Sequence, residues 1–329
     1  METTLKRALA ILLGGLAATA LLLPAAHAQS DYPTRPVTLI NPYAPGGPAD
    51  TLARELASRL KDRLGQPVVV ENKAGSGAMV GTGYVARAKP DGYTLLMGTS
   101  PGMVVGPLIE RATYDGLKDF DLVGLVANQP VVLVANAKLG INTMQDLLDR
   151  ARKQPGKLNF ASAGTGGPTH LAGELLRRRA NIDITHVPYK GAAPALQDLI
   201  GGQVELGMLS ASPVLPFVKD GRLKAIAYTG AKRSSLLPDV PTMAEAGIKN
   251  WNEVSTWYAL AAPRGTPPAI IEKLSSALTA INAEPEHQRF LAQQDGSIDN
   301  MTPAEVTAFA QKDKTAMTEL LGALDMLAK

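Results

Sequence analysis

The sequence contains no cysteine, and only 5% of its 329 residues are aromatic. Without thiols the protein can form no disulfide, so its stability must come from the packing of its core. The chain also has no P-loop pattern and no group of His, Asp or Glu with the spacing of metal ligands, so we expect neither a cofactor nor a metal. Its formal net charge is only +3, which gives no support for a nucleic-acid partner because phosphate binding needs a concentrated basic face.

The first residues have the pattern of a secretory signal peptide. Lys6 and Arg7 precede an apolar run at residues 8–23, and Pro24 ends this run just before a small-residue stretch that contains Ala26 and Ala28. A run of roughly 16 apolar residues is short for a membrane span of about 20. We therefore predict export to the periplasm by a cleavable signal peptide, residues 1–28, with cleavage after Ala28.

Short β-branched runs and longer amphipathic stretches alternate along the next two thirds of the chain. The runs that read as strands lie at 37–40, 67–71, 93–97, 158–161, 184–187, 204–208 and 223–228, and the stretches that read as helices lie at 49–64, 79–88, 143–153, 170–179, 193–200 and 212–219. This alternation predicts an α/β fold with parallel sheets covered by helices. After a further strand at 255–261 the pattern is helical only, at 268–282, 284–293 and 303–327.

Two segments suggest that the chain crosses between two Rossmann-like lobes. Only three residues separate the apolar runs at 122–127 and 131–135, and the proline-rich segment at 237–247 leads to the strand at 255–261 without a full helix. Two such crossings predict a two-segment hinge and a ligand cleft between the lobes. We assign residues 29–127 and 253–329 to lobe 1, and residues 128–252 to lobe 2.

Two loops of the same design follow predicted strands, one in each lobe. The first reads NPYAPGGPADTLAREL from Asn41, and the second reads NFASAGTGGPTHLAGEL from Asn159. Proline after the two glycines suits the first position of a helix, and the glycines allow positive φ and close approach of a ligand. Helix N-termini present N–H groups and the positive end of the helix dipole, which attract anions. Residues 41–50 and 161–170 contain no Lys or Arg, so an anion there would be held by neutral donors.

Each feature of these loops also has a purely structural interpretation. Taken alone, one Gly-Gly-Pro loop fits a tight strand-to-helix connection better than a binding site. Asp50 can be explained as an acidic residue that complements the helix dipole in the first helical turn. His170 can be explained as a histidine that caps the helix or packs in the core. The repetition of the same device in both lobes favours anion binding.

The enzyme motifs in the sequence are incomplete. Gly98, Ser100 and Gly102 satisfy the G-x-S-x-G pattern of a serine hydrolase, in which the residue after the serine donates its N–H to the oxyanion hole. That residue is Pro101, which has no N–H. The glycines of a dinucleotide-like pattern at residues 81–86 lie about nine residues beyond the predicted strand, whereas the fingerprint follows its strand directly. We predict that the protein is not an enzyme, and keep an esterase using Ser100 only as a remote alternative.

Six stretches, in one order along the chain, carry a family resemblance: YPTRPVTLINPYAPGGPAD, VVVENKAGSGAMVGTGYVARAKPDGYTLLMG, FASAGTGGPTHLAGELL, THVPYKGAAPALQDLIGGQVELGM, RLKAIAYTGAKRSSLLPDVPTMAEAG and WYALAAPRGTPPAIIEKL. With them the chain resembles the Bug-type extracytoplasmic solute receptors, the substrate-binding components of tripartite tricarboxylate transporters. The resemblance implies a type II periplasmic-binding-protein fold, a small carboxylate-bearing ligand, a monomer, and membrane transporter subunits as partners. A periplasmic sensor that reports the closed form to a signalling protein fits the same residues.

The resemblance also implies a set of ligand-binding residues. The first grip would comprise Tyr43, Pro45, Gly46, Gly47 and Asp50, the second grip Ser162, Ala163, Gly164, Thr165, Gly166 and His170, and the side walls Ser76, Ser100, Tyr189 and Ser210. The chain departs from the family at Gly167, where many members have serine, near Ser210, where many have Asp or Asn, and in its last helix. The identity of the ligand stays open.

Overall fold

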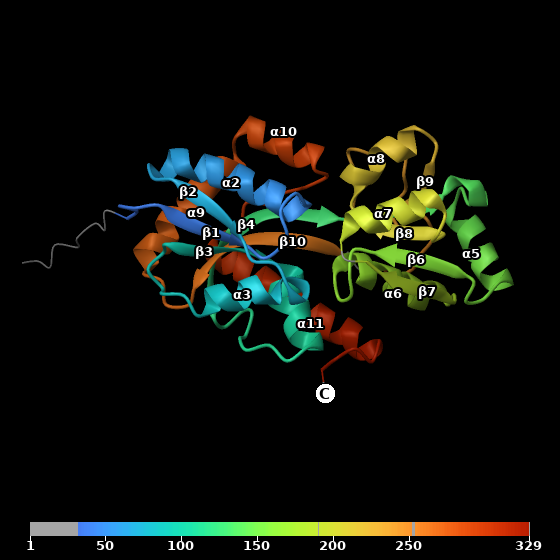
Figure 1. Ribbon diagram of the computed structural model, residues 1–329, viewed down its shortest axis with the longest axis horizontal. Coiled ribbons are helices and arrows are strands. Elements are labelled where there is room, and N and C mark those ends of the chain that lie inside the picture. Colours follow the sequence, from blue (N-terminus) through green and yellow to red (C-terminus); the bar gives the residue numbers. More distant parts are fainter. Residues whose placement is uncertain (1–31, 190, 252–253, 329) are drawn as a thin grey trace, which may run out of the picture. The chain divides into compact units, whose positions relative to one another are not determined.

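A computed structural model describes residues 32–189, 191–251 and 254–328, and the predicted signal peptide and its cleavage site lie outside these residues. The chain from Pro33 onward forms one folded unit that contains two five-stranded sheets (Figure 1). No helix in the described ranges is both long enough and apolar enough to cross a membrane.

The first sheet has the order β2-β1-β3-β10-β4. Its strands are β1 (Val37–Asn41), β2 (Val68–Asn72), β3 (Thr94–Thr99), β4 (Phe120–Pro130) and β10 (Ser255–Pro263). β1 is parallel to β2 and β3, whereas β10 is antiparallel to β3 and β4. The predicted parallel strands are therefore present, and an antiparallel pair joins them on one side.

The second sheet has the order β7-β6-β8-β5-β9. Its strands are β5 (Val132–Asn136), β6 (Leu158–Ser162), β7 (Ile184–Pro188), β8 (Leu206–Leu209) and β9 (Leu223–Tyr228). β6 is parallel to β7 and β8, whereas β5 is antiparallel to β8 and β9. The chain enters both β5 and β10 from the other sheet rather than through a crossover helix, so neither strand is forced to be parallel to its neighbours.

Helices cover both faces of each sheet (Figure 1). On the first sheet, α2 (Pro48–Leu64) and α9 (Pro268–Asn282) lie on one face, with α10 (Pro285–Gln293) after α9, and α3 (Met79–Ala86) and α11 (Pro303–Ala323) lie on the other. The second sheet is covered by α5 (Met144–Lys153), α6 (Pro168–Ala180), α7 (Ala192–Gly201) and α8 (Ala211–Lys219). The mixed fold of two parallel-rich sheets with flanking helices confirms the predicted class.

Four short helical segments have no counterpart in the sequence prediction. They are η2 (Ser76–Ala78), η3 (Pro101–Val105), α4 (Gly106–Ile109) and η4 (Ala137–Leu139). Their sequences are rich in glycine or too short to show a helical period, which explains why the hydrophobic pattern does not reveal them.

The first crossing between the sheets is nearly immediate. β4 continues in the first sheet to Pro130, which pairs with Ser255, and β5 begins at Val132. The crossing therefore lies about three residues beyond the predicted boundary at residue 127, because the polar residues 128–130 extend the strand instead of forming a loop.

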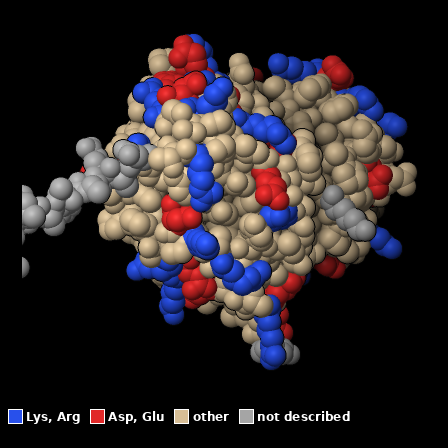
Figure 2. All heavy atoms as spheres, turned by 60° about the vertical axis from the view of Figure 1, so that its left-hand side comes forward, with Lys and Arg blue, Asp and Glu red and all other residues tan. Residues whose placement is uncertain are grey.

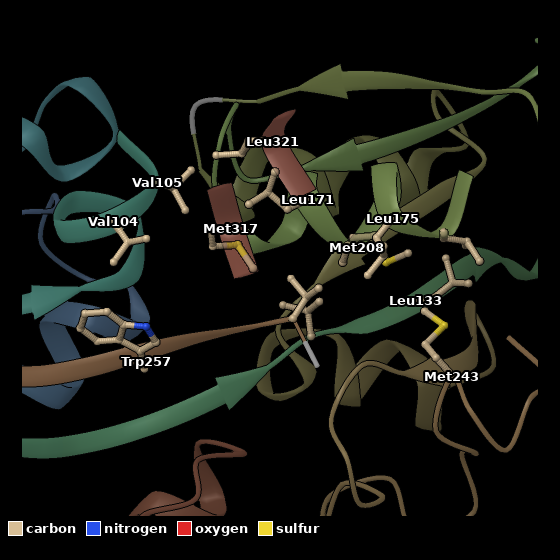
Figure 3. Close-up of a cluster of buried hydrophobic side chains, with 14 of the residues drawn as sticks. Val104, Val105, Leu133, Leu171, Leu175, Met208, Met243, Trp257, Met317 and Leu321 are labelled. Atoms are coloured by element: carbon tan, nitrogen blue, oxygen red, sulfur yellow. The ribbon is translucent and has the colours of Figure 1, made fainter. Parts of the chain in front are cut away.

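One buried hydrophobic cluster includes residues from both halves of the chain (Figure 3). Val105 of η3, Leu171 and Leu175 of α6, and Met317 and Leu321 of α11 belong to it. The Arg178 guanidinium at the end of α6 also donates a hydrogen bond to the Ala323 carbonyl at the end of α11. The helix that follows the second loop is therefore packed against the last helix of the chain.

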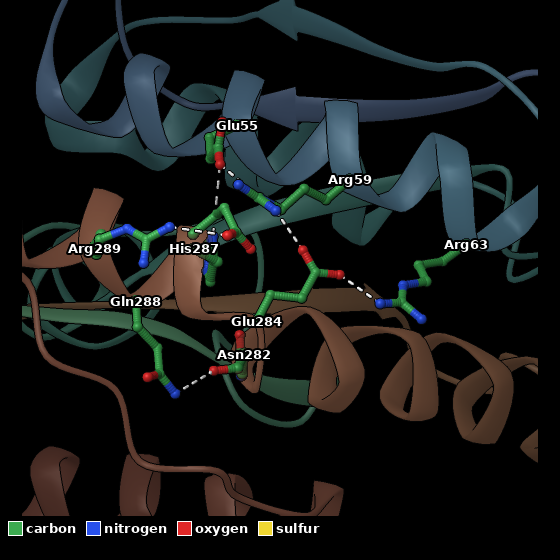
Figure 4. A network of polar contacts seen from close by, with 9 residues as sticks. Glu55, Arg59, Arg63, Asn282, Glu284, His287, Gln288 and Arg289 are labelled. Carbon is green, nitrogen blue, oxygen red and sulfur yellow. Dashed lines mark hydrogen bonds and ion pairs between the residues drawn. The ribbon is translucent and has the colours of Figure 1, made fainter.

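A polar network fastens α2 to α10 (Figure 4). Glu284, which precedes α10, accepts hydrogen bonds from Arg59 and Arg63 of α2, and Arg59 also donates to Glu55. These bonds lower the pKa of the Glu284 carboxyl against the opposing effect of burial. They fix α2, and thus the loop at its N-terminus, to the rest of the first sheet.

Candidate ligand-binding loops

The first loop, residues 41–50, turns at two glycines into α2. Gly46 has a φ of +85°, and Gly47 is the N-cap with Pro48 as the first helical residue. The Gly46 N–H donates a 3.0 Å hydrogen bond to Oδ2 of Asp50, four residues later. The loop is thus closed on itself by an acidic side chain of the first helical turn.

Asp50 is buried and holds several groups of this loop together. It accepts hydrogen bonds from Arg54 Nε (2.9 Å) and Asn72 Nδ2 (2.9 Å), and Asn72 Nδ2 also lies 3.0 Å from the Tyr43 carbonyl oxygen. Burial by itself raises the pKa of the Asp50 carboxyl, but the bonds from Arg54, Gly46 and Asn72 outweigh burial and lower it to about 2. Asp50 is therefore ionised at neutral pH, and its oxygens are occupied by the protein.

The second loop, residues 161–170, repeats this arrangement before α6. Gly166 has a φ of +78°, and its N–H donates a 3.0 Å hydrogen bond to Nδ1 of His170, again four residues later. The Ala163 N–H donates to Thr169 Oγ1 (3.0 Å) and the Gly164 N–H to Ser162 Oγ (3.2 Å). Asp50 and His170 thus have the same structural task in the two loops.

These bonds change which amides can hold an anion. The amides of Gly46 and Gly166 are taken by side chains of the following turn, so these two glycines are not the free donors of the loops. In the glycine turns and the first helical turns that follow them, the N–H groups of Gly47, Ala49, Thr165, Gly167 and Thr169 have no hydrogen-bond partner among the described residues. They lie at the N-termini of α2 and α6, where the helix dipole favours negative charge.

Two stacked histidines support the second loop. The rings of His170 and His186 lie 3.9 Å apart at 21°, and His186 Nε2 is 2.6 Å from Ser162 Oγ. Burial disfavours the charged imidazolium and lowers the pKa of His170, although the Glu174 carboxylate opposes this shift. Burial also lowers the pKa of His186, and the neighbouring His170 lowers it further, to about 4. Both rings are therefore neutral at neutral pH, as the bond from Gly166 to His170 Nδ1 requires.

Ser100 does not have the environment of a catalytic nucleophile. Its backbone is helical (φ −50°, ψ −43°) at the start of η3, and only 4% of the residue is exposed. Its Oγ has no hydrogen-bond partner among the described residues, so no histidine activates it. With Pro101 as the next residue, the strained turn and the oxyanion donor of a nucleophile elbow are both missing.

The other expected wall residues have different surroundings. Ser76 lies in a run of positive φ values from Gly75 to Ala78. Tyr189 donates its N–H to the Ser162 carbonyl (3.1 Å) and its hydroxyl to Asp198 Oδ2 (2.8 Å), and burial together with this carboxylate raises its pKa to about 12. Ser210 is the half-buried N-cap of α8 and makes no side-chain capping bond.

The structure brings the second loop against the segment that follows Ser100. A Cβ atom placed on Gly166 would lie 2.5 Å from Cδ1 of Ile109 in α4, whereas one on Gly46 would meet nothing within 4 Å. No hydrogen bond among the described residues joins the two loops directly. Tyr189 contacts the second loop through the hydrogen bond from its N–H to the Ser162 carbonyl. Pro45, Gly46 and Thr165 are exposed at the tips of the two loops.

Sequence reasoning missed Asn72, Thr99 and His186 as parts of these loops. Thr99 Oγ1 lies 3.4 Å from the Tyr43 hydroxyl, whose pKa burial raises to about 12 despite this contact. Asn72 and Thr99 are the last residues of β2 and β3, and His186 lies in the middle of β7. Polar residues at the carboxyl ends of parallel strands are a signal that could have found Asn72 and Thr99, because those ends meet at one edge of a sheet.

Comparison with known proteins shows the family to which the chain belongs. The family model described as "Tripartite tricarboxylate transporter family receptor" matches residues 52–326. The chain belongs to this family. Members of the tripartite tricarboxylate transporter receptor family are periplasmic solute-binding proteins rather than enzymes.

Individual family members are similar over most of their length. BugT of Bordetella pertussis is 40% identical over 80% of this chain and 81% of its own. MatC of Rhodopseudomonas palustris, solved with bound malate, is 31% identical with a TM-score of 0.79 over 88% of this chain and 100% of its own. A second R. palustris protein, solved with adipate, is 32% identical with a TM-score of 0.82, and the match covers 88% of this chain and 97% of that protein.

Proposed function

We propose that the protein is a periplasmic receptor that binds a small carboxylate between its two loops and delivers it to the membrane components of a tripartite transporter. The observation that carries this proposal is the pair of loops, each closed by a glycine-to-side-chain bond and each leaving N–H groups unpaired at a helix N-terminus. The malate and adipate named with two relatives of this fold are both dicarboxylates, which supports the ligand class.

The two loops differ in charge, which assigns different ends of the ligand to them. The first turn of α2 contains ionised Asp50, whereas the first turn of α6 contains no acidic residue. A resident carboxylate already complements the dipole of α2. We infer that the second loop takes the carboxylate of the ligand and that the first loop contacts its remaining polar atoms.

Neutral donors of one loop are too weak to explain tight binding. A hydrogen bond to a charged group contributes about 1.5–3 kcal/mol, so three contribute roughly 6. Micromolar affinity requires about 8 kcal/mol. The proposal therefore includes closure of the two sheets as lobes on a monomeric receptor, with donors from both loops reaching one ligand.

A thermal-shift screen of mono- and dicarboxylates, amino acids and aromatic acids tests the ligand class. A ligand at 100 times its Kd stabilises the folded state by about 2.7 kcal/mol, so a matching carboxylate should raise the melting temperature, and its neutral diamide should not. If no carboxylate in the screen stabilises the protein, or if the diamide works equally well, the proposed function is wrong.

Removing single N–H donors tests the assignment of the ligand ends. Gly167 and Gly47 have φ values of −79° and −87°, which proline can adopt nearly unchanged, so Gly167→Pro and Gly47→Pro each delete one N–H. We expect Gly167→Pro to weaken carboxylate binding by about 1.5–3 kcal/mol and Gly47→Pro to weaken it less. Calorimetry measures both affinities, and unchanged melting temperatures without ligand show that the fold is intact. Equal losses, or none in Gly167→Pro, contradict the assignment.

A further inference from the structure

A surface hollow of about 510 Å³ lies away from both loops, on the first sheet. We call it the Tyr84 hollow. It is lined by Arg35, Thr38, Tyr84, Arg87, Ala88, Lys89, Asp91, Tyr93 and Thr94. All of these residues belong to β1, α3, β3 or the segments beside them, so the hollow involves no residue of the second sheet.

The Tyr84 hollow exists because α3 is too short to cover its face of the sheet. α3 has eight residues, and its buried Val85 packs with Ile40 in the same hydrophobic cluster. Two residues before Ile40, on the same face, Thr38 pairs with Val69 of β2 and with Thr94 of β3. The short α3 leaves this row of three residues, Val69, Thr38 and Thr94, uncovered.

The uncovered row carries exposed apolar and aromatic groups. Val69 is 54% exposed and Tyr84 is 44% exposed, and only three large hydrophobic side chains of the described chain are exposed to this degree. β2 is also the edge strand of the sheet and pairs only with β1 among the described strands. An exposed apolar surface next to an open strand edge is typical of a protein contact.

The charges around the Tyr84 hollow are mainly positive. Arg35 stacks on the Tyr93 ring at 3.8 Å and forms an ion pair with Asp91 at 3.3 Å. Arg87 and Lys89 have no carboxylate within ion-pair distance in the described part of the chain. Figure 2, which brings the left-hand side of Figure 1 forward, shows groups of Lys and Arg side chains on that side, with Asp and Glu side chains between them. Two cations without carboxylate partners make the hollow complementary to acidic groups.

We propose that the Tyr84 hollow is the docking surface for an acidic segment of the transporter's membrane components; this rests on the proposed receptor function. The surface is concave and has two exposed apolar side chains, Tyr84 and Val69. A protein segment can insert side chains into such a hollow, whereas a flat lipid surface cannot. Because the hollow involves only the first sheet, the contact is the same whether or not the loops have closed on a ligand. It therefore anchors the receptor, while the ligand-dependent signal is read elsewhere.

The test is uptake into proteoliposomes that contain the transporter's membrane components, measured against receptor concentration, with the carboxylate that stabilises the receptor as substrate. The variants are Arg87→Glu/Lys89→Glu and Tyr84→Ala. The control is Lys153→Glu/Lys157→Glu, which makes the same change of charge at two exposed lysines of the second half. We expect the hollow variants to raise the half-saturating receptor concentration about tenfold by placing repulsive charge or removing the apolar contact. Maximal uptake and ligand affinity should be unchanged.

Each other result overturns the docking proposal. An unchanged half-saturating concentration, an equal effect in the lysine control, or a changed ligand affinity would show that the hollow does not anchor the receptor. Binding of the wild-type receptor to anionic phosphatidylserine vesicles without transporter, lost in the hollow variants, would assign the surface to lipid. Absence of any stabilising carboxylate would instead defeat the receptor function itself, before docking is tested.

Discussion

At the scale of single residues, the second loop depends on imidazoles that stay uncharged. His170 Nδ1 accepts the Gly166 N–H, so a proton on this nitrogen would replace an acceptor by a donor, and His186, stacked on His170, contacts Ser162 through Nε2. The charged groups nearest to the pair are Glu174, 4.0 Å from His170 Nε2, and Arg177, which pairs with Glu174. Glu174 raises the pKa of His170, but burial is the larger effect and lowers the pKa of both rings.

His186 gives a prediction for the pH dependence of stability. Its pKa is lowered from 6.5 to about 4 in the folded protein, so the unfolded chain takes up the proton first, and stability falls as the pH falls from about 6.5 towards 4. We expect His186→Gln, which keeps a polar partner for Ser162, to flatten this part of the curve of melting temperature against pH. A His287→Gln variant removes a buried histidine of α10, whose pKa burial also lowers, and shows how much of the slope comes from outside the second loop. Curves of identical slope for wild type and His186→Gln would contradict the assignment.

At the scale of elements, the orientation of α2 depends on its polar contacts with α10. Glu284 accepts hydrogen bonds from two arginines of α2 (Figure 4), and these bonds lower the pKa of its carboxyl. The ionised carboxylate therefore stabilises the folded protein above its ordinary pKa of 4.5, and this stabilisation is lost as the pH falls below 4.5. The first loop leads directly into α2, and the bonds from Arg59 and Arg63 to Glu284 fix the position of α2.

Replacing Glu284 by Gln tests the network. We expect Glu284→Gln to lower the free energy of unfolding by about 1 kcal/mol, because two charge-assisted bonds weaken in a partly exposed setting. Glu286→Gln is the control, since Glu286 pairs with Arg289 where both side chains are largely exposed, and it should cost about 0.5 kcal/mol or less. Urea unfolding at pH 7 and pH 4 measures both, and the difference between wild type and Glu284→Gln should shrink in acid. Equal losses in the two variants would contradict a special role for Glu284.

At the scale of the whole molecule, the two sheets share one hydrophobic cluster. α11 follows the strands of the first sheet in sequence, yet Leu321 and Met317 pack in one cluster with Leu171 and Leu175 of α6 (Figure 3). The helix behind the second loop is thus in contact with the end of the chain. This arrangement predicts that the two halves unfold together.

Truncating Leu321 tests this coupling. The side chain is fully buried, so Leu321→Ala should cost about 2–5 kcal/mol. Leu327→Ala, at an exposed leucine of the same end of the chain, should change stability by about 0.5 kcal/mol or less. Scanning calorimetry should show a single transition in wild type and a single, lower one in Leu321→Ala. Two resolved transitions in wild type would show that the halves are independent.

The sequence by itself determined the alternation of strands and helices, the Gly-Gly-Pro loops before α2 and α6, and the family, because these depend on residues close together in the chain. Tertiary structure alone decided that Gly46 and Gly166 donate to Asp50 and His170, that Asn72 and His186 reach the loops from neighbouring strands, and that β5 and β10 run antiparallel. It also decided that a short α3 leaves the Tyr84 hollow open. Spacing along a chain fixes which face of an element is apolar, but which strand lies beside another is set by long-range packing that no local pattern encodes.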